Sequence, residues 1–159
     1  MPEPAAIRAL LHHSKRENVA KKVLFVCAHN SGRSLMAEAF FNALAQGRGT
    51  ATSAGTEPGP GPNPAVVDSM AEVGLDVSGH QPRLLSQEMA DQADLTVTVC
   101  SIDEACPVVF GAVEHWELRD PAGQPAEKVR QIRDQVRVRA EQLLKELFCL
   151  SILSANRLL

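Results

Sequence analysis

Short uninterrupted apolar runs alternate along this chain with segments whose apolar residues recur at helical spacing. The first run, KVLFV, is followed by a segment in which Met36, Phe40 and Leu44 recur at every fourth position. A continuous apolar run of this kind is typical of a strand buried on both faces, and its alternation with helices favours a parallel sheet covered on both sides. The pattern therefore predicts an α/β fold.

Further strands are predicted at TATSAG, DLTVTVC and AVEHWEL, which gives the order strand, helix, strand, helix, strand, short helix, strand, helix. Asn63 and Pro64 are residue types of a helix N-cap and first helical position, and Gly74 is expected to close that helix. The last helix is predicted from Glu127 onward. Its buried stripe is expected to consist of Val129, Ile132, Val136, Ala140, Leu143 and Leu147. The residues expected to form a solvated basic face beside this stripe are Arg130, Arg133 and Arg137.

We expect the chain to consist of an N-terminal extension at 1–20, a domain at 21–150 and a C-terminal tail at 151–159. With 159 residues, 45% of them hydrophobic, it can bury the core of one domain. The formal net charge of −3 gives no electrostatic reason to expect nucleic acid or an anionic membrane as a partner. No apolar run approaches the ~20 residues of a membrane span, and the first residues lack the apolar segment of a signal peptide, so we expect a cytoplasmic protein.

Three residues with chemically useful side chains follow predicted strands: Cys27, Cys100 and Asp120. Ligands in parallel α/β folds bind at the carboxyl ends of the strands, so we expect these side chains to gather at one edge of the sheet. Asp-Pro is also a common turn dipeptide, so it is the position of Asp120 after a strand that makes it a candidate.

The segment between the first strand and the first helix is predicted to bind an oxyanion. A tight turn at a helix start presents free backbone N–H groups, Gly32 allows close approach, and Arg33 adds a planar fork of donors. The same field stabilises a thiolate, so Cys27 is predicted to be a nucleophile that accepts a hydrogen bond from Ser34. The alternative is a packed cysteine at the end of a strand and an unrelated surface arginine. The predicted oxyanion-binding residues are Ala28, His29, Asn30, Ser31, Gly32, Arg33 and Ser34.

The stretch VLFVCAHNSGRSLMAEAF resembles the phosphate-binding loop of the low-molecular-weight tyrosine phosphatase superfamily. Three further stretches, SAGTEPGPGPNPAVVDSMAEVGLDVSGHQP, VTVCSIDEACP and HWELRDPAG, are similar to its arsenate reductase branch. The resemblance implies a three-layer αβα, flavodoxin-like fold with a four-stranded parallel sheet. It also implies reduction of arsenate to arsenite in arsenic detoxification.

Carried over residue by residue, the resemblance assigns Cys27 as the nucleophile, Arg33 as the anion clamp and Asp120 as the acid. Cys100 and Cys106 match the two redox cysteines of the thioredoxin-coupled enzymes. The implied partners are arsenate, phosphate or sulfate as competing oxyanions, and thioredoxin or a similar dithiol protein as reductant. No cofactor is implied.

Other polar residues are expected to have supporting roles. Asn30 matches the asparagine that shapes the cradle, and by resemblance Arg83 places a positive charge where some relatives bind potassium. The side chain of His29 is expected to point outward, and His80 is expected to pack against or cap a loop. The last cysteine, Cys149, is expected to be a spectator at a helix end.

A zinc site at Cys100, Cys106 and His115 is an alternative interpretation of two of the cysteines. No paired ligand spacing supports it, so we expect no metal.

Two other functions compete with arsenate reduction. A phosphatase needs only the nucleophile and the acid, and it predicts that Cys100 and Cys106 can be replaced without loss of turnover. A non-catalytic oxyanion or arsenic sensor predicts tight binding with no turnover. The chain contains no Tyr, and AGQPAEK follows Asp120-Pro121, so no aromatic ring is expected near the acid to hold a phosphotyrosine.

Overall fold

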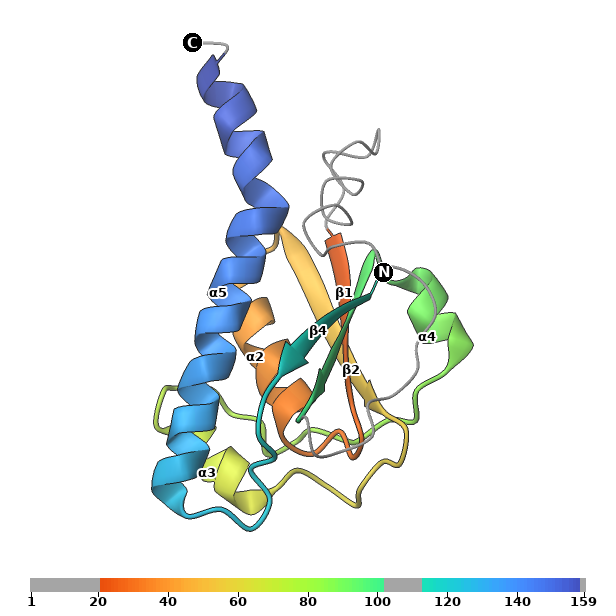
Figure 1. Ribbon diagram of the computed structural model, residues 1–159, viewed down its shortest axis with the longest axis vertical. Coiled ribbons are helices and arrows are strands. Elements are labelled where there is room, and N and C mark those ends of the chain that lie inside the picture. Colours follow the sequence, from red (N-terminus) through yellow and green to blue (C-terminus); the bar gives the residue numbers. More distant parts are fainter. Residues whose placement is uncertain (1–20, 102–112, 158–159) are drawn as a thin grey trace.

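The computed structural model describes residues 21–101 and 113–157 of the chain. Strands and helices alternate along most of this length (Figure 1). In chain order the elements are β1 (Lys21–Cys27), α2 (Arg33–Ala45), β2 (Gly49–Gly55), α3 (Pro64–Ala71), α4 (Gln87–Gln92), β3 (Leu95–Cys100), β4 (Val113–Glu117) and α5 (Ala126–Arg157).

The four strands form one parallel sheet in the order β2-β1-β3-β4. β1 and β3 occupy the two central positions, which agrees with their continuous apolar sequences and with the burial of every residue of β3. Val26 of β1 is paired with Thr98 of β3, so the two central strands end almost level with each other. Cys27 and Cys100 therefore lie at the same edge of the sheet, as the sequence predicted.

Helices cover both faces of this sheet (Figure 1). The larger core lies under α2, α3 and α5 and includes Phe25, Val97 and Trp116 of the strands. A smaller core lies on the opposite face, where Met89 and Ala90 of α4 pack against Leu24, Val26 and Ala54. The predicted three-layer αβα architecture with a four-stranded parallel sheet is confirmed.

The predicted helix boundaries agree closely with the structure. Asn63 Oδ1 accepts a hydrogen bond from Ala65 N–H at 2.9 Å, and Pro64 is the first residue of α3. Three residues after the end of α3, Gly74 adopts φ of 83°, the left-handed conformation that favours glycine. All six residues of the predicted stripe on α5 are buried.

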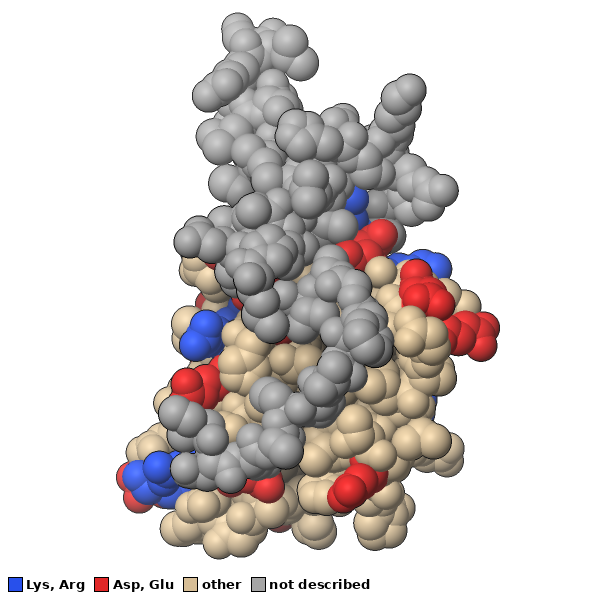
Figure 2. Space-filling model, turned by 45° about the vertical axis from the view of Figure 1, so that its right-hand side comes forward, with Lys and Arg blue, Asp and Glu red and all other residues tan. Residues whose placement is uncertain are grey.

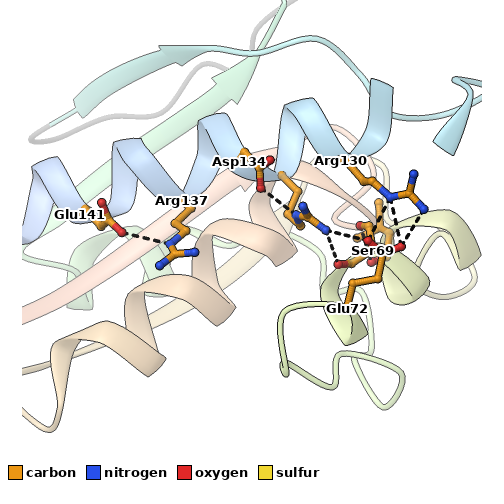
Figure 3. Close-up of polar contacts among 8 residues, drawn as sticks. Ser69, Glu72, Arg130, Asp134, Arg137 and Glu141 are labelled. Carbon is orange, nitrogen blue, oxygen red and sulfur yellow. Dashed lines mark hydrogen bonds and ion pairs between the residues drawn. The ribbon is translucent and has the colours of Figure 1, made fainter. Parts of the chain in front are cut away.

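The expectation of a solvated basic face on α5 is wrong for one of its arginines. Arg133 is buried, and its guanidinium donates to Ser69 O at 2.9 Å and to Glu72 Oε2 at 3.1 Å. Arg130, which is exposed, also binds Glu72, whereas Arg137 pairs with Glu141 on α5 itself (Figure 3). Helix periodicity placed these residues off the apolar stripe but could not show that α3 packs over one of them.

Two helical segments differ from the sequence-based expectation. The short helix α4 precedes β3 and was not predicted, since six residues are too few to establish a period. The short helix expected between β3 and β4 falls in 102–112, outside the described residues. α5 continues without a break to Arg157, into the segment predicted as a tail.

The described surface shows scattered charges. On the face drawn in Figure 2, acidic and basic side chains lie among uncharged residues, and neither sign gathers in one continuous patch on the described part. Among the described residues, no helix is both long and apolar enough to cross a membrane.

Candidate active site

The loop that joins β1 to α2, residues 28–32, surrounds the sulfur of Cys27. Cys27 is the last residue of β1 and is only 2% exposed. The backbone N–H of Asn30 donates to Cys27 Sγ at 3.2 Å, and Ser34 Oγ lies 2.9 Å from the same sulfur. α2 begins at Arg33, so the positive end of its dipole faces the loop. The sulfur therefore has a backbone N–H group, a hydroxyl group and a helix N-terminus around it.

A second loop orients the backbone of the first. The N–H groups of Glu57, Gly59 and Asn63 donate to the carbonyl oxygens of residues 28, 29 and 31, at 2.8, 3.0 and 2.9 Å. In a planar trans peptide the C=O of one residue points away from the N–H of the next. The N–H groups of residues 29, 30 and 32 are therefore turned to the inside of the loop. N–H groups arranged in this way form a cradle suited to an anion, in the segment for which the sequence predicts oxyanion binding.

Asn30 fixes the shape of the cradle from behind. Its φ of 53° lies in the left-handed region, which Asn tolerates better than most residues, and its side chain is fully buried. Asn30 Oδ1 accepts from the backbone N–H of Arg83 at 3.0 Å, and Asn30 Nδ2 donates to Ser34 Oγ at 2.8 Å. When Cys27 is a thiolate, which can only accept, the Ser34 hydroxyl is the donor of its hydrogen bond to Cys27 Sγ. This is the hydrogen bond expected from the sequence.

His80 connects the cradle to a half-buried carboxyl group. Its Nε2 lies 3.0 Å from Asn30 Oδ1, which can only accept, so Nε2 carries a proton. Its Nδ1 lies 3.5 Å from Glu38 Oε2. Burial raises the pKa of Glu38, against the opposing charge of Arg83, and burial lowers the pKa of His80. Both shifts favour the uncharged pair, in which the Glu38 carboxyl holds the proton between them.

The sequence predicted only packing or capping for His80 and did not single out Glu38. The two residues lie far apart in the sequence, and no spacing pattern links them. Arg83 was expected to bring a positive charge to this region, and its electrostatic effect on Glu38 agrees with that expectation.

Arg33 and Asp120 meet at the mouth of the cradle. Arg33 is 3% exposed, and one arm of its guanidinium donates to Leu118 O at 3.0 Å, which fixes the direction of the side chain. Its other arm lies 3.8 Å from Asp120 Oδ2. The Asp120 side chain is 42% exposed, and Oδ1 accepts from Ala122 N–H at 2.9 Å. The structure thus brings the predicted acid to the predicted anion clamp.

Glycines allow these loops to approach one another. A Cβ on Gly32 would lie 2.9 Å from Pro121 Cγ, and a Cβ on Gly55 would clash with Ala28 O. The remaining loop side chains face outward: Ser31 Oγ donates to His29 O at 3.1 Å, and His29 Nδ1 lies 3.0 Å from Glu57 O. His29 is exposed, as expected.

Cys100 lies at the end of the strand next to β1. It is 2% exposed and disulfide-bonded. Cys27, by contrast, is a free thiol. Cys106 lies outside the described residues, as does the side chain of Cys149, so their predicted roles are not tested. Within 21–101 and 113–148 no cluster of three His, Cys, Asp or Glu side chains could hold a metal ion.

A buried thiol inside inward-facing N–H groups, with a fixed guanidinium and a carboxyl group at the mouth, is the arrangement that nucleophilic attack by sulfur on a tetrahedral oxyanion requires. The family profile described as low molecular weight phosphotyrosine protein phosphatase matches residues 22–149. The chain belongs to this family.

Relatives within the family carry more specific names. An arsenate reductase of Staphylococcus epidermidis is 38% identical over 124 residues, which cover 76% of this chain and 94% of the relative. A glutaredoxin arsenate reductase of Synechocystis is 38% identical over 130 residues, covering 80% and 98%.

Solved structures agree with this comparison. An arsenate reductase in a phosphate-binding state superimposes with a TM-score of 0.72 at 38% identity, covering 80% of this chain and 98% of the other. A thioredoxin-dependent arsenate reductase of Corynebacterium glutamicum gives 0.68 at 27% identity, covering 91% and 69%.

Proposed function

We propose that this protein reduces arsenate to arsenite with its cysteine thiols and so detoxifies arsenic. One observation carries the proposal: a free Cys27 inside an oxyanion cradle lies at the same sheet edge as Cys100, which is disulfide-bonded, on the neighbouring strand. A hydrolase needs only the first of these sulfurs, whereas a two-electron reduction needs a second. The arsenate reductases among the relatives support the same function.

In the proposed reaction the inward N–H groups and Arg33 bind the arsenate oxygens, and the Cys27 thiolate attacks arsenic. Asp120 protonates the departing oxygen, which leaves as water. Cys100 then attacks Cys27 Sγ, the sulfur–arsenic bond breaks, and its electron pair stays on arsenic. Arsenite leaves, and one disulfide has formed for each arsenate reduced, so the two sulfurs lose the two electrons that arsenic gains.

The disulfide must then be reduced from outside. We propose that Cys106 attacks Cys100 and frees Cys27, and that an external dithiol protein of the thioredoxin or glutaredoxin type reduces the Cys100–Cys106 pair. Relatives whose names include each of these reductants support a dithiol protein of this kind. Such a cycle requires a compartment that keeps thiols reduced, which supports the cytoplasm as its location.

Hydrolysis of phosphomonoesters is the second candidate function, because the family includes phosphatases and phosphate is a tetrahedral oxyanion like arsenate. The sequence after Asp120 argues against phosphotyrosine as the main substrate. Pro121 is followed by Ala122, Gly123 and Gln124, none of which can stack on an aromatic ring.

A single-turnover thiol count tests the proposal. The protein is fully reduced, the reductant is removed, arsenate is added, and the remaining thiols are trapped and mapped by mass spectrometry. We expect arsenate to consume two thiols per chain, with phosphate consuming none. A Cys106→Ser variant is expected to stop with Cys27 joined to Cys100, and a Cys149→Ser variant to behave as the wild type.

Other outcomes separate the competing functions. If all thiols survive arsenate while a Cys100→Ser variant hydrolyses 4-nitrophenyl phosphate at the wild-type rate, the protein is a phosphatase. If arsenate binds and neither thiol loss nor hydrolysis follows, the protein is a sensor.

A further inference from the structure

β3 and β4 place a histidine beside the sulfur of Cys100. Thr98 and His115 are register partners on these strands, and Cys100 follows two residues later on the same face of β3. His115 Nδ1 lies 3.8 Å from Cys100 Sγ and 3.1 Å from Thr98 Oγ1. Cys100 is buried, whereas His115 is exposed. The imidazole ring therefore connects a buried sulfur to solvent.

Thr98 can serve both protonation states of the ring nitrogen that faces the sulfur. When the neutral ring carries its proton on Nε2, His115 Nδ1 is an acceptor and the Thr98 hydroxyl, 3.1 Å away, can donate to it. When Nδ1 carries a proton, Thr98 Oγ1 accepts from it and can turn its own proton to the backbone carbonyl of Glu114, 3.5 Å away. The same nitrogen faces Cys100 Sγ, so a proton that moves from the sulfur to the ring is held by a hydrogen bond.

We propose that His115 accepts the proton of the Cys100 thiol when Cys100 attacks, and protonates Cys100 again when its disulfide is reduced. This inference rests on the proposed reductase function. The neutral ring, with its own proton on Nε2, takes the thiol proton at Nδ1, which leaves a thiolate next to an imidazolium. The thiolate attacks Cys27 Sγ, a sulfur–sulfur bond forms, the sulfur–arsenic bond breaks, and its electron pair reduces arsenic to arsenite.

The return step uses the same nitrogen. When the external dithiol reduces the disulfide of Cys100, the imidazolium gives a proton to the departing Cys100 sulfur. In this structure Cys100 is disulfide-bonded, which is the state between the two proton transfers. Because His115 is exposed, the ring can exchange its proton with solvent in this interval.

Few other titratable groups of the described residues share this face of the sheet. Glu117 of β4 is the register partner of Cys100, and β1 contributes only Lys22 at its opposite end. α4, which packs on this face, carries Glu88 and Asp91, both exposed. Asp103 and Glu104 lie outside the described residues. All of these groups are retained in the variants below, except where Glu117 is itself changed.

The test follows the ionisation of each thiol in the reduced protein. Iodoacetamide alkylation is measured for every cysteine by mass spectrometry across a pH series, in the wild type and in His115→Asn. Asparagine retains an N–H donor near the position of Nδ1 but cannot accept a proton. We expect Cys100 alkylation near neutral pH to slow by about tenfold or more and its midpoint to move to higher pH, with the Cys27 profile unchanged.

Matched variants separate proton transfer from structure and charge. Thr98→Val keeps the ring but removes its hydrogen-bond partner, so we expect a smaller shift of Cys100 in the same direction. If His115→Asn does not fold, Thr98→Val serves as the test variant in its place. Glu117→Gln removes a negative charge beside Cys100, so we expect its midpoint to stay or to move to lower pH. An unchanged Cys100 midpoint in His115→Asn, or an equal change at Cys27, overturns the proposal.

Alkylation needs no arsenate, so this result is independent of the thiol count described above. A wild-type protein that loses no thiols to arsenate would overturn the reductase function while the alkylation profiles still report on His115. If both proposals hold, arsenite release in a single turnover of His115→Asn is slow at about pH 7 and approaches the wild-type rate at about pH 9, where Cys100 ionises without a base.

Discussion

Ser34 Oγ lies 2.9 Å from Cys27 Sγ and accepts a hydrogen bond from Asn30 Nδ2 at 2.8 Å. The contact between Ser34 and Cys27 is buried, and the hydroxyl is its donor when the sulfur is a thiolate, which can only accept. A hydrogen bond to a charged group is worth roughly 1.5–3 kcal/mol, so this serine has a measurable effect on the nucleophile.

Ser34→Ala is therefore expected to slow the reaction of Cys27 with iodoacetamide near neutral pH by about tenfold. The rate at high pH, where the thiol ionises unaided, should approach that of the wild type. Ser78→Ala is the matched control, since the Ser78 hydroxyl donates to Asp76 on the surface. Equal rates for Ser34→Ala and the wild type at all pH values would show that the hydroxyl does not stabilise the thiolate.

Gly32→Ala is expected to separate anion binding from the acid step. The new Cβ would lie 2.9 Å from Pro121 Cγ, so the loop that carries Asp120 must move away from the cradle. We expect turnover of 4-nitrophenyl phosphate to fall by about tenfold to a hundredfold. Phosphate should still protect Cys27 from alkylation, because alanine retains the backbone N–H.

Gly61→Ala serves as the control for that substitution, since nothing lies within 4 Å of a Cβ at this position. It should leave turnover unchanged. A Gly32→Ala variant with wild-type turnover would show that the two loops need not be in close contact.

Glu38→Gln is expected to change the pH dependence of stability. The pKa of Glu38 is raised from 4.5 by burial, so the folded state holds the proton more tightly than the unfolded state does. The contribution of Glu38 to the free energy of unfolding is favourable below pH 4.5. It is lost as the pH rises through the higher pKa that Glu38 has in the folded state. The variant should therefore gain stability relative to the wild type as pH rises above 4.5, as measured by urea unfolding at several pH values.

Glu72→Gln provides a control of opposite sign. Hydrogen bonds from Arg130, with a smaller contribution from Arg133, lower the pKa of Glu72 from 4.5. The contribution of Glu72 to the free energy of unfolding is present above pH 4.5. It is lost as the pH falls through the lower pKa that Glu72 has in the folded state. This variant should lose stability at neutral pH and approach the wild type in acid. The same direction of change in both variants would contradict the assignment of the two shifts.

The two arginines that bind Glu72 should differ in their effect on stability. The Arg133 side chain is 10% exposed and donates to Ser69 O, whereas the Arg130 side chain is 49% exposed. Arg133→Ala leaves a buried carbonyl without that donor and should lower the free energy of unfolding by about 1–3 kcal/mol. Arg130→Ala should have a much smaller effect. Urea unfolding of both variants checks the order, which equal losses would contradict.

Much of the fold was predictable because its determinants are local. The continuous apolar sequence of β1, the cap at Asn63 and the stripe on α5 are read from neighbouring residues. α4 was missed because it has only six residues, and its packing on Leu24 and Val26 belongs to tertiary structure. The burial of Arg133 was missed for a similar reason, since it depends on where α3 packs.

The same distinction applies to the site. Cys27, Arg33 and Ser34 were predicted from one short stretch, whose order places them around a single turn. The supports of that turn, Glu38 behind His80 and the second loop beyond Gly55, were not singled out. They approach the cradle from other elements, and only the assembled sheet brings them together.

The level ends of β1 and β3 have a consequence for how such enzymes change over evolutionary time. Neighbouring strands lie about 4.8 Å apart, so the backbone at the end of β3 lies beside the backbone at Cys27. In a phosphatase the second nucleophile is water, whereas in the proposed reductase it is the sulfur of Cys100. On such a fold, substitutions at the end of one strand and in the segment after it can change one into the other. The residues proposed to bind the anion, at the end of β1 and the start of α2, can stay the same.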